Sequence, residues 1–444
     1  MEKHFDLIAI GGGSGGLAVA EKAAEYGQKV AVVEPYKMGG TCVNNGCVPK
    51  KVMWYAANLA HAVDDAKGFG VPAKRGPTDW QTLIAGRDNY ISNINNYWDG
   101  YVDQSGITRI DGYARFVGDK RIEVDGEIYS ADHVVIATGG KPIVPPVPGA
   151  ELGITSDGFF QMQEQPKNVA IVGGGYIGVE LAGVLQALGS QVTVVALEER
   201  VLEVFDPMIS DVLMEEMRKQ GINLRMSFRV AGLAQTDQGI AMDAADGERL
   251  DGFDTVIWAV GRAPNTRELN AEAAGIEMRA NGIIPTDEYQ NTNVPGIYAI
   301  GDITGRTPLT PVAIAAGRRL AARLFLGQSE QRVDYQNIPS VVHLNSFAMK
   351  PVIAPLTPQF FSFEQRANTS KFEADFVNYS DGMGQHSLSI STTCPQVDIA
   401  RRLADDVLFP ATVETDRSGK IPTQQLQAIQ DAGLYGIFST EAVG

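Results

Sequence analysis

Two glycine-rich segments, residues 11–16 and 173–178, each follow a short apolar run, residues 5–10 and 167–172. An apolar strand that ends in a G-x-G-x-x-G loop and continues into a helix is the fingerprint of a dinucleotide-binding βαβ unit. Its glycines let the backbone approach a pyrophosphate at the helix N-terminus. In the first unit a second apolar run ends at Glu34, whose carboxylate can accept from a ribose hydroxyl. The repeat predicts an α/β fold with two Rossmann-like dinucleotide-binding domains and two bound nucleotides.

A pair of cysteines, Cys42 and Cys47, follows the first unit, and Cys394 is the only other cysteine in the sequence. Three cysteines are too few for a structural disulfide framework, so a close pair in a reducing compartment is a candidate redox disulfide. Pro49 lies two residues after Cys47. A proline at a first helical position predicts a helix that starts beside this thiol, where the helix dipole would stabilise a thiolate.

The bulk properties predict a cytoplasmic enzyme. A chain of 444 residues is long enough for two or three domains. Its net charge of -16 argues against nucleic acid or an anionic membrane as a partner. No apolar run approaches the roughly 20 residues that span a bilayer, and the N-terminus does not have the pattern of a signal peptide. No metal site is expected.

The chain resembles the glutathione reductase branch of the pyridine-nucleotide disulfide oxidoreductases over about residues 1–342. The segments that carry the resemblance are the cysteine box at residues 39–51 and residues 137–140, 173–178, 259–262, 301–302 and 309–313. The resemblance implies an FAD domain formed by residues 1–144 and 263–342, because a buried strand near Gly296 returns the chain to the first unit. It implies an inserted NAD(P)H domain at residues 145–262, reached through the proline-rich linker 142–148.

The resemblance also implies the nucleotide-binding residues. For FAD these are Gly11, Gly13, Ser14, Gly16, Glu34, Thr41, Ala137, Thr138, Gly139, Asp302 and Thr310. For the nicotinamide nucleotide they are Gly173, Gly175, Tyr176, Gly178, Glu198, Gly261 and Arg262. Tyr176 corresponds to the residue that covers the nicotinamide pocket. Asp302 and Thr310 correspond to positions that hold the ribitol and the pyrimidine end of the flavin.

The implied reaction passes electrons from NADH through FAD to the Cys42–Cys47 disulfide and then to a small disulfide substrate. In the resembling family, the residue matching Cys47 faces the flavin, and the residue matching Cys42 attacks the substrate. Lys50 and Glu180 carry over as an ion pair beside the flavin, where hydride arrives. The alternative for this pair is a set of solvated helix charges.

Residues after the second strand of the inserted domain favour NADH over NADPH. Leu197 and Glu203 stand where NADPH enzymes of this branch have two arginines for the 2'-phosphate. Glu198 can instead accept from a 2'-hydroxyl, whereas carboxylates here would repel a phosphate. Arg200 leaves NADPH open as the less favoured reductant.

A substitution on the first helix bears on the substrate. Glu21 stands where glutathione reductases have an arginine that binds the glycine carboxylate of glutathione. A carboxylate at this position repels the glycine carboxylate of glutathione but can accept a hydrogen bond from an amide. The chain therefore most resembles the NADH-dependent glutathione amide reductases. Ser14, Trp98 and Arg318 match other substrate-contacting positions. The alternative for Glu21 is an ordinary surface charge.

The C-terminal region departs from the family after residue 342. The family's dimer interface domain ends in a His-Pro box, and the sequence contains no His-Pro pair. His343 and His386 are therefore expected to be incidental polar residues. Residues 343–395 favour loop, and 397–408 and 421–434 favour helices. Residues 397–444 resemble the N-terminal helices of acyl-CoA dehydrogenases, which indicates a fusion or a joined pair of fragments. The alternative is extreme divergence of the family's own C-terminal domain.

These features predict a flavoprotein that reduces glutathione or glutathione amide disulfide, with turnover slowed and the family homodimer weakened by the altered C-terminus. Two alternatives stay open: a dihydrolipoamide dehydrogenase-like enzyme and a catalytically incomplete FAD-binding fusion protein. The spacer 43–46 and the segment 289–293 argue against the first alternative, because both resemble glutathione reductases. Turnover of a disulfide substrate would distinguish an enzyme from a catalytically incomplete FAD-binding protein.

Overall fold

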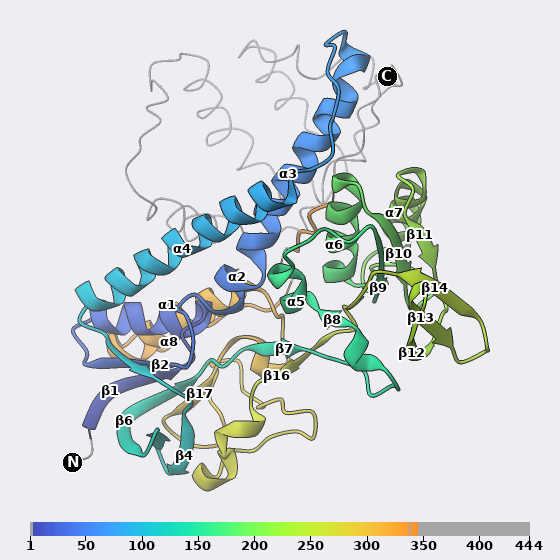
Figure 1. Cartoon of the computed structure of the whole chain (residues 1–444). Coiled ribbons are helices and arrows are strands. Elements are labelled where there is room, and N and C mark those ends of the chain that lie inside the picture. The colour runs from blue at the N-terminus through green and yellow to red at the C-terminus, as the bar shows by residue number, and fades with distance from the viewer. Residues whose placement is uncertain (1–2, 337, 339, 345–444) are drawn as a thin grey trace, which may run out of the picture. The chain divides into compact units, whose positions relative to one another are not determined.

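The computed structural model describes residues 3–336, 338 and 340–344. The first glycine fingerprint follows a strand of a seven-stranded sheet (Figure 1). The strand order is β3-β2-β1-β6-β5-β4, and β17 pairs with the carboxyl end of β6. The strands are β1 (Lys3–Ile10), β2 (Val30–Glu34), β3 (Thr108–Asp111), β4 (Arg115–Gly118), β5 (Arg121–Val124), β6 (Glu127–Ile136) and β17 (Ile297–Ala299). The fully buried β17 returns the chain to this sheet, as the sequence predicts.

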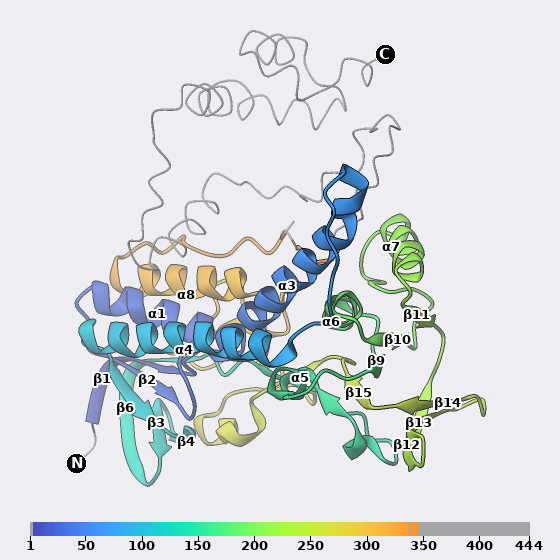
Figure 2. The ribbon, with the colours of Figure 1, turned by 45° about the horizontal axis from the view of Figure 1, so that its top comes forward.

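Two helices lie side by side on one face of this sheet (Figure 2). They are α1 (Ser14–Glu25) and α8 (Thr310–Phe325). A Cβ added at Gly317 would lie only 2.7 Å from Gly15 O and 3.0 Å from Val19 N, so glycine permits this close helix contact. The helices between β2 and β3 are α2 (Gly40–Asn44), α3 (Cys47–Ala66), η1 (Lys67–Phe69) and α4 (Trp80–Gln104).

The second glycine fingerprint lies in a parallel five-stranded sheet with the order β11-β10-β9-β15-β8. These strands are β8 (Ile154–Thr155), β9 (Asn168–Val172), β10 (Gln191–Val195), β11 (Asn223–Arg225) and β15 (Thr255–Trp258). The helices of this unit are η2 (Ala150–Leu152), α5 (Ser156–Gln161), α6 (Tyr176–Leu188) and α7 (Pro207–Lys219). Its antiparallel three-stranded sheet contains β12 (Val230–Thr236), β13 (Gly239–Ala244) and β14 (Arg249–Phe253).

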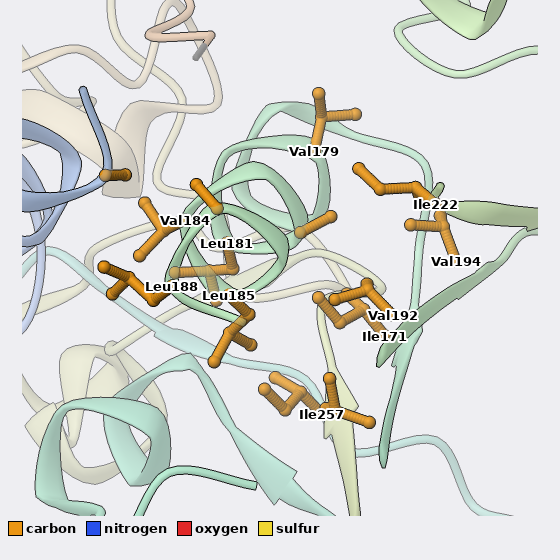
Figure 3. Packing of buried hydrophobic residues seen from close by; sticks show 14 of the residues in the cluster. Ile171, Val179, Leu181, Val184, Leu185, Leu188, Val192, Val194, Ile222 and Ile257 are labelled. Atoms are coloured by element: carbon orange, nitrogen blue, oxygen red, sulfur yellow. The ribbon is translucent and has the colours of Figure 1, made fainter. Parts of the chain in front are cut away.

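Both faces of the parallel sheet are buried, which explains the near-continuous apolar runs of its strands. Ile171, Val192 and Ile257 face α6, where they pack with Leu185 (Figure 3). Alternate residues of the strands face the antiparallel sheet, and Trp258 packs there in a second cluster. Burying a side chain of this size contributes roughly 1.5–3 kcal/mol, so α6 is held firmly at the end of its glycine loop.

A two-stranded ribbon joins the two sheets. β7 (Gly140–Pro142) pairs antiparallel with β16 (Arg262–Pro264), where the chain leaves the first sheet and comes back to it. The chain then passes through η3 (Arg267–Leu269), η4 (Ala271–Ala274) and η5 (Gly301–Thr304). β7 ends at Pro142, which is the first residue of the linker that the sequence places at residues 142–148.

The predicted α/β fold with two Rossmann-like units is confirmed by these two sheets. The predictions for the C-terminal loop, the two C-terminal helices, the acyl-CoA dehydrogenase resemblance and His386 concern residues outside the described part of the chain, where Cys394 also lies. The weak homodimer also stays a prediction. Within the described part of the chain, no helix has both the length and the hydropathy needed to cross a bilayer.

Candidate nucleotide sites and redox centre

The first glycine loop has the backbone geometry that a pyrophosphate site requires. Gly11 has φ +112°, and a Cβ there would lie 2.4 Å from Ala137 O. A Cβ at Gly16 would lie 1.9 Å from Gly11 O, so both positions require glycine. Gly13 is the N-cap of α1 and makes no side-chain cap, which leaves the N–H groups of the first turn, beginning at Ser14, to face an anion.

Glu34 is oriented for a ribose at the end of β2. Its Oε2 accepts from Gly12 N at 2.7 Å and its Oε1 accepts from Tyr36 N at 3.0 Å. Burial raises the pKa of Glu34, and the two backbone hydrogen bonds oppose that rise. A carboxylate has about four acceptor positions, so both oxygens retain capacity for hydroxyl groups.

The segment after β6 offers a further polar group to this site. Thr138 Oγ1 is buried and has no hydrogen-bond partner among the described residues. Gly139 has φ +65°, and its carbonyl accepts from Asn265 N. Together with the glycine loop and Glu34, these groups fit the ADP part and pyrophosphate of an FAD. Thr41, also predicted for FAD, lies on α2 and is exposed.

The second glycine loop repeats the first in detail. Gly173 has φ +127° with a virtual Cβ 2.3 Å from Ala259 O, and Gly178 has one 2.1 Å from Gly173 O. Gly175 is the N-cap of α6, and a Cβ there would meet nothing within 4 Å. The open first turn of α6 fits the pyrophosphate of a second dinucleotide.

The repeat also shows where the two sites differ. Gly11 N donates to Val33 O, and Gly173 N donates to Val195 O, so Ala196 occupies the position that Glu34 has in the first unit. Glu198 follows two residues later, half-buried, and its carbonyl accepts from Ser227 N.

The loop after β10 provides no prepared phosphate clamp. Leu197 is 54% exposed and Glu203 is exposed. Arg200 Nε donates to Asp211 Oδ1 at 2.6 Å, so its charge already has a carboxylate partner.

The two cysteines lie where two helices begin. Cys42 is on α2, and Cys47 is the first residue of α3. The predicted helix beside the Cys47 thiol is confirmed, but Pro49 is the third residue of α3 and not the first, because Gly46 is the N-cap. The helix therefore begins at the thiol itself, which strengthens the predicted effect of the dipole.

Cys42 and Cys47 are both free thiols, and a hydrogen bond between them shifts their pKa values in opposite directions. The hydrogen bond from Cys42 lowers the pKa of Cys47 to about 6, with smaller contributions from Thr310, Lys50 and Lys51 that together outweigh burial. The same hydrogen bond, followed by burial, raises the pKa of Cys42. Cys47 is therefore the thiolate at neutral pH, and Cys42 holds the proton.

Lys50 and Glu180 form the predicted ion pair. Lys50 Nζ on α3 lies 2.8 Å from Glu180 Oε1 on α6, and the two residues are only 8% and 7% exposed. Lys50 is three residues after Cys47, so both lie on the same face of α3. Burial acts to raise the pKa of Glu180, but the hydrogen bond from His343 and the charge of Lys50 lower it overall. The alternative of two solvated charges is wrong.

His343 meets this ion pair, so the expectation that it is incidental is also wrong. Its backbone N donates to Glu180 Oε1 at 2.7 Å, and its Nδ1 lies 3.4 Å from the same oxygen. No local pattern in the sequence indicates this contact, because His343 lies beyond the segments that carry the family resemblance.

Arg262 lies in β16 of the ribbon that joins the two units. Its guanidinium donates to Gly140 O in the ribbon, and it follows Gly261, whose φ is +129°. Burial raises the pKa values of Tyr176, Asp302 and Asp157, and the charge of Arg262 opposes each rise. Asp157 is absent from the sequence-based candidates, although its Oδ1 is buried without a hydrogen-bond partner in the described part of the chain.

The predicted substrate residues lie on α1, α4 and α8. Glu21 Oε1 accepts from Tyr101 OH at 3.0 Å, a contact that the sequence does not indicate. Burial, and then the charge of Glu21, raises the pKa of Tyr101 to about 12. Trp98 packs edge-on against Tyr101, with ring centroids 5.8 Å apart, and also packs against the cluster that contains Val43. Arg318 is half-buried on α8.

Comparisons with known proteins agree with this geometry. Residues 5–317 match the family model described as pyridine nucleotide-disulphide oxidoreductase. A glutathione reductase from Schizosaccharomyces pombe is 45% identical over 353 residues, covering 77% of this chain and 76% of that protein. A glutathione reductase from Yarrowia lipolytica is 42% identical over 393 residues, covering 84% of this chain and 83% of that protein. The chain belongs to the pyridine nucleotide-disulphide oxidoreductase family.

Proposed function

We propose that this protein is an NADH-dependent flavoprotein that reduces glutathione disulfide or glutathione amide disulfide. The observation that carries the proposal is the Cys42–Cys47 pair, in which Cys42 on α2 faces the sulfur of Cys47 at the first residue of α3. Cys47 lies on the same helix as Lys50, whose partner Glu180 comes from the second nucleotide unit. The glutathione reductases that resemble the chain over most of its length support the disulfide substrate.

Bound FAD would accept an electron pair from the nicotinamide and deliver it to the Cys42–Cys47 disulfide. The FAD residues are those named for the first unit, including Glu34 at the ribose and the first turn of α1 at the pyrophosphate. The domains would be residues 1–144 with 263–342 for FAD, and 145–262 for the nicotinamide nucleotide.

The reduced cysteines would then act in two steps. Cys42 transfers its proton to the Cys47 thiolate and attacks the substrate disulfide, forming a mixed disulfide and releasing the first thiol, which takes up a proton from solvent. Cys47 passes its proton to the departing substrate sulfur, attacks the Cys42 sulfur of the mixed disulfide and so releases the second thiol. The enzyme disulfide is restored, and one disulfide has become two thiols.

Lys50 and Glu180 would hold a fixed cation beside the reacting groups. Lys50 lowers the pKa of Cys47, so its charge favours the thiolate that the exchange needs. Glu180 keeps Lys50 in place, since a buried ammonium without a partner is strongly disfavoured.

The preference for NADH rests on the loop after β10. Ala196 lacks the carboxylate of Glu34, but Glu198 can reach a 2'-hydroxyl from two residues further along. Neither Leu197 nor Glu203 can clamp a 2'-phosphate, and Arg200 is paired with Asp211.

The preference for an uncharged amide end of the substrate rests on Glu21. The hydrogen bond from Tyr101 holds the Glu21 carboxylate beside the Tyr101 ring, which packs against Trp98. Such a carboxylate accepts from an amide and repels a carboxylate.

The test is steady-state oxidation of NADH by purified, FAD-loaded protein with each of the two disulfides. Disulfide-dependent turnover supports the proposal. NADH oxidation that is unchanged by either disulfide would leave a flavin-binding protein without reductase activity and would reject it.

A further inference from the structure

Residues 342–344 are anchored at the junction of α3 and α6. Trp54 Nε1 on α3 donates to Leu344 O at 2.9 Å. The Trp54 ring meets the His343 ring edge-on, with centroids 5.2 Å apart and an interplanar angle of 81°. Val342 and Leu344 pack against the core cluster that contains the buried side chains of α6. His343 is therefore held between Trp54 and Glu180.

A single oxygen of Glu180 serves three nitrogens. Oε1 accepts from Lys50 Nζ at 2.8 Å and from the backbone N of His343 at 2.7 Å. His343 Nδ1 lies 3.4 Å from the same atom. The His343 side chain is 25% exposed, whereas that of Glu180 is 8% exposed. The imidazole can therefore exchange a proton with solvent, while the carboxylate it faces stays buried.

We propose that His343 is a positioning residue whose protonation state sets how firmly Glu180 holds Lys50, and so makes the redox centre respond to pH. The inference rests on the proposed role of Lys50 beside Cys47. With neutral His343, Lys50 and Glu180 compensate each other. A protonated His343 competes with Lys50 for Oε1 and adds one positive charge to the cluster. The uncompensated charge then favours electron arrival at the flavin and thiolate at Cys47.

The groups around the imidazole limit other sources of this effect. α3 contributes Lys50 and the uncharged Trp54, and α6 contributes Glu180. α7 contributes Glu216, which lines a small cavity with Leu344 and is paired with Lys219 at 2.7 Å.

The first measurement is the rate of flavin reduction by NADH between about pH 5.5 and 8, by stopped flow. In the wild type, reduction should slow by about five- to tenfold as the pH rises. His343→Gln retains a polar side chain without a titrating charge, and His343→Phe retains the ring packed on Trp54. Both variants should lose this dependence and run near the wild-type rate at high pH. His61→Gln, elsewhere on α3, should keep the wild-type profile.

The second measurement is the midpoint potential of the bound flavin, by equilibration with a redox dye and without NADH or disulfide. The wild-type potential should be more positive than that of His343→Gln at about pH 5.5, and the two should converge at about pH 8. This result supports the inference even if NADH fails to reduce the flavin or no disulfide turns over, outcomes that reject the proposed function alone. Potentials of wild type and His343→Gln that differ equally at both pH values would overturn the inference, as would variants that keep the wild-type rate profile.

Discussion

Cys47 Sγ lies 3.7 Å from Thr310 Oγ1, although 263 positions separate the two residues in the chain. Each residue is the first of its helix, so the N-termini of α3 and α8 converge on one sulfur. The contact depends on the return of the chain to the first sheet through β17. The thiolate therefore depends on both segments that build this unit.

This convergence predicts how the thiolate responds to pH. The pKa of Cys47 is lowered to about 6, so the thiolate should persist above that value and be lost as the pH falls through it. In reduced, FAD-loaded protein, the long-wavelength absorbance of a thiolate against the flavin should follow this curve. Thr310→Val removes the hydroxyl contact and should shift the midpoint upward by about half a unit. Thr307→Val is the matched control and should leave the curve unchanged, while an unshifted curve for Thr310→Val would remove Thr310 from the account.

The ion pair predicts a large effect on stability. Lys50→Met leaves the Glu180 carboxylate buried with only His343 as partner and should cost about 3–5 kcal/mol. Lys50→Met with Glu180→Leu removes both charges and should cost less than the single change. Urea unfolding of the apoprotein at neutral pH measures both. A single-variant cost below about 1 kcal/mol would mean that the pair is solvated. Because the pKa of Glu180 is lowered, its contribution should be present above the ordinary glutamate value and lost as the pH falls through the lowered one.

The loop after β10 predicts a switch of reductant. Replacing Leu197 and Glu203 with arginine should move the preference toward NADPH by at least about 1 kcal/mol, the scale of a charge-assisted contact. The comparison is the ratio of kcat/KM for the two nucleotides. Glu199→Arg adds charge to the same loop at another position and is the control for nonspecific attraction. A wild-type protein that clearly prefers NADPH would contradict the assignment.

The Glu21–Tyr101 contact predicts substrate selectivity. Glu21→Arg should lower KM for glutathione disulfide by about tenfold and raise it for the amide form, because the charge facing the substrate end is reversed. Tyr101→Phe keeps the carboxylate and should leave the order of the two substrates unchanged. If Glu21→Arg affects both disulfides equally, Glu21 does not contact the part of the substrate that distinguishes them.

The sequence carries local signals for the parts of the site that are built locally. The glycine loops, Glu34 and the cysteine pair each lie within one βαβ unit, where strand, loop and helix follow directly along the chain. Lys50 and Glu180 are predicted from the family resemblance and not from spacing. Contacts that join distant segments carry no such signal, and these include His343 with Glu180 and Thr310 with Cys47. Such contacts depend on how segments far apart in the chain pack together, which periodicity does not encode. The position of Pro49 shows the same limit locally, since the helix begins two residues earlier than the proline indicates.

Anaerobic titration of the FAD-loaded protein with NADH, combined with a thiol count, tests the central claim that the Cys42–Cys47 pair receives electrons from the flavin. The wild type should consume one hydride equivalent for the flavin and another for the disulfide, and it should expose two new thiols. Cys47→Ser should bind FAD but accept only the equivalent that reduces the flavin. Equal uptake by the two proteins, with no new thiols in the wild type, would contradict the account.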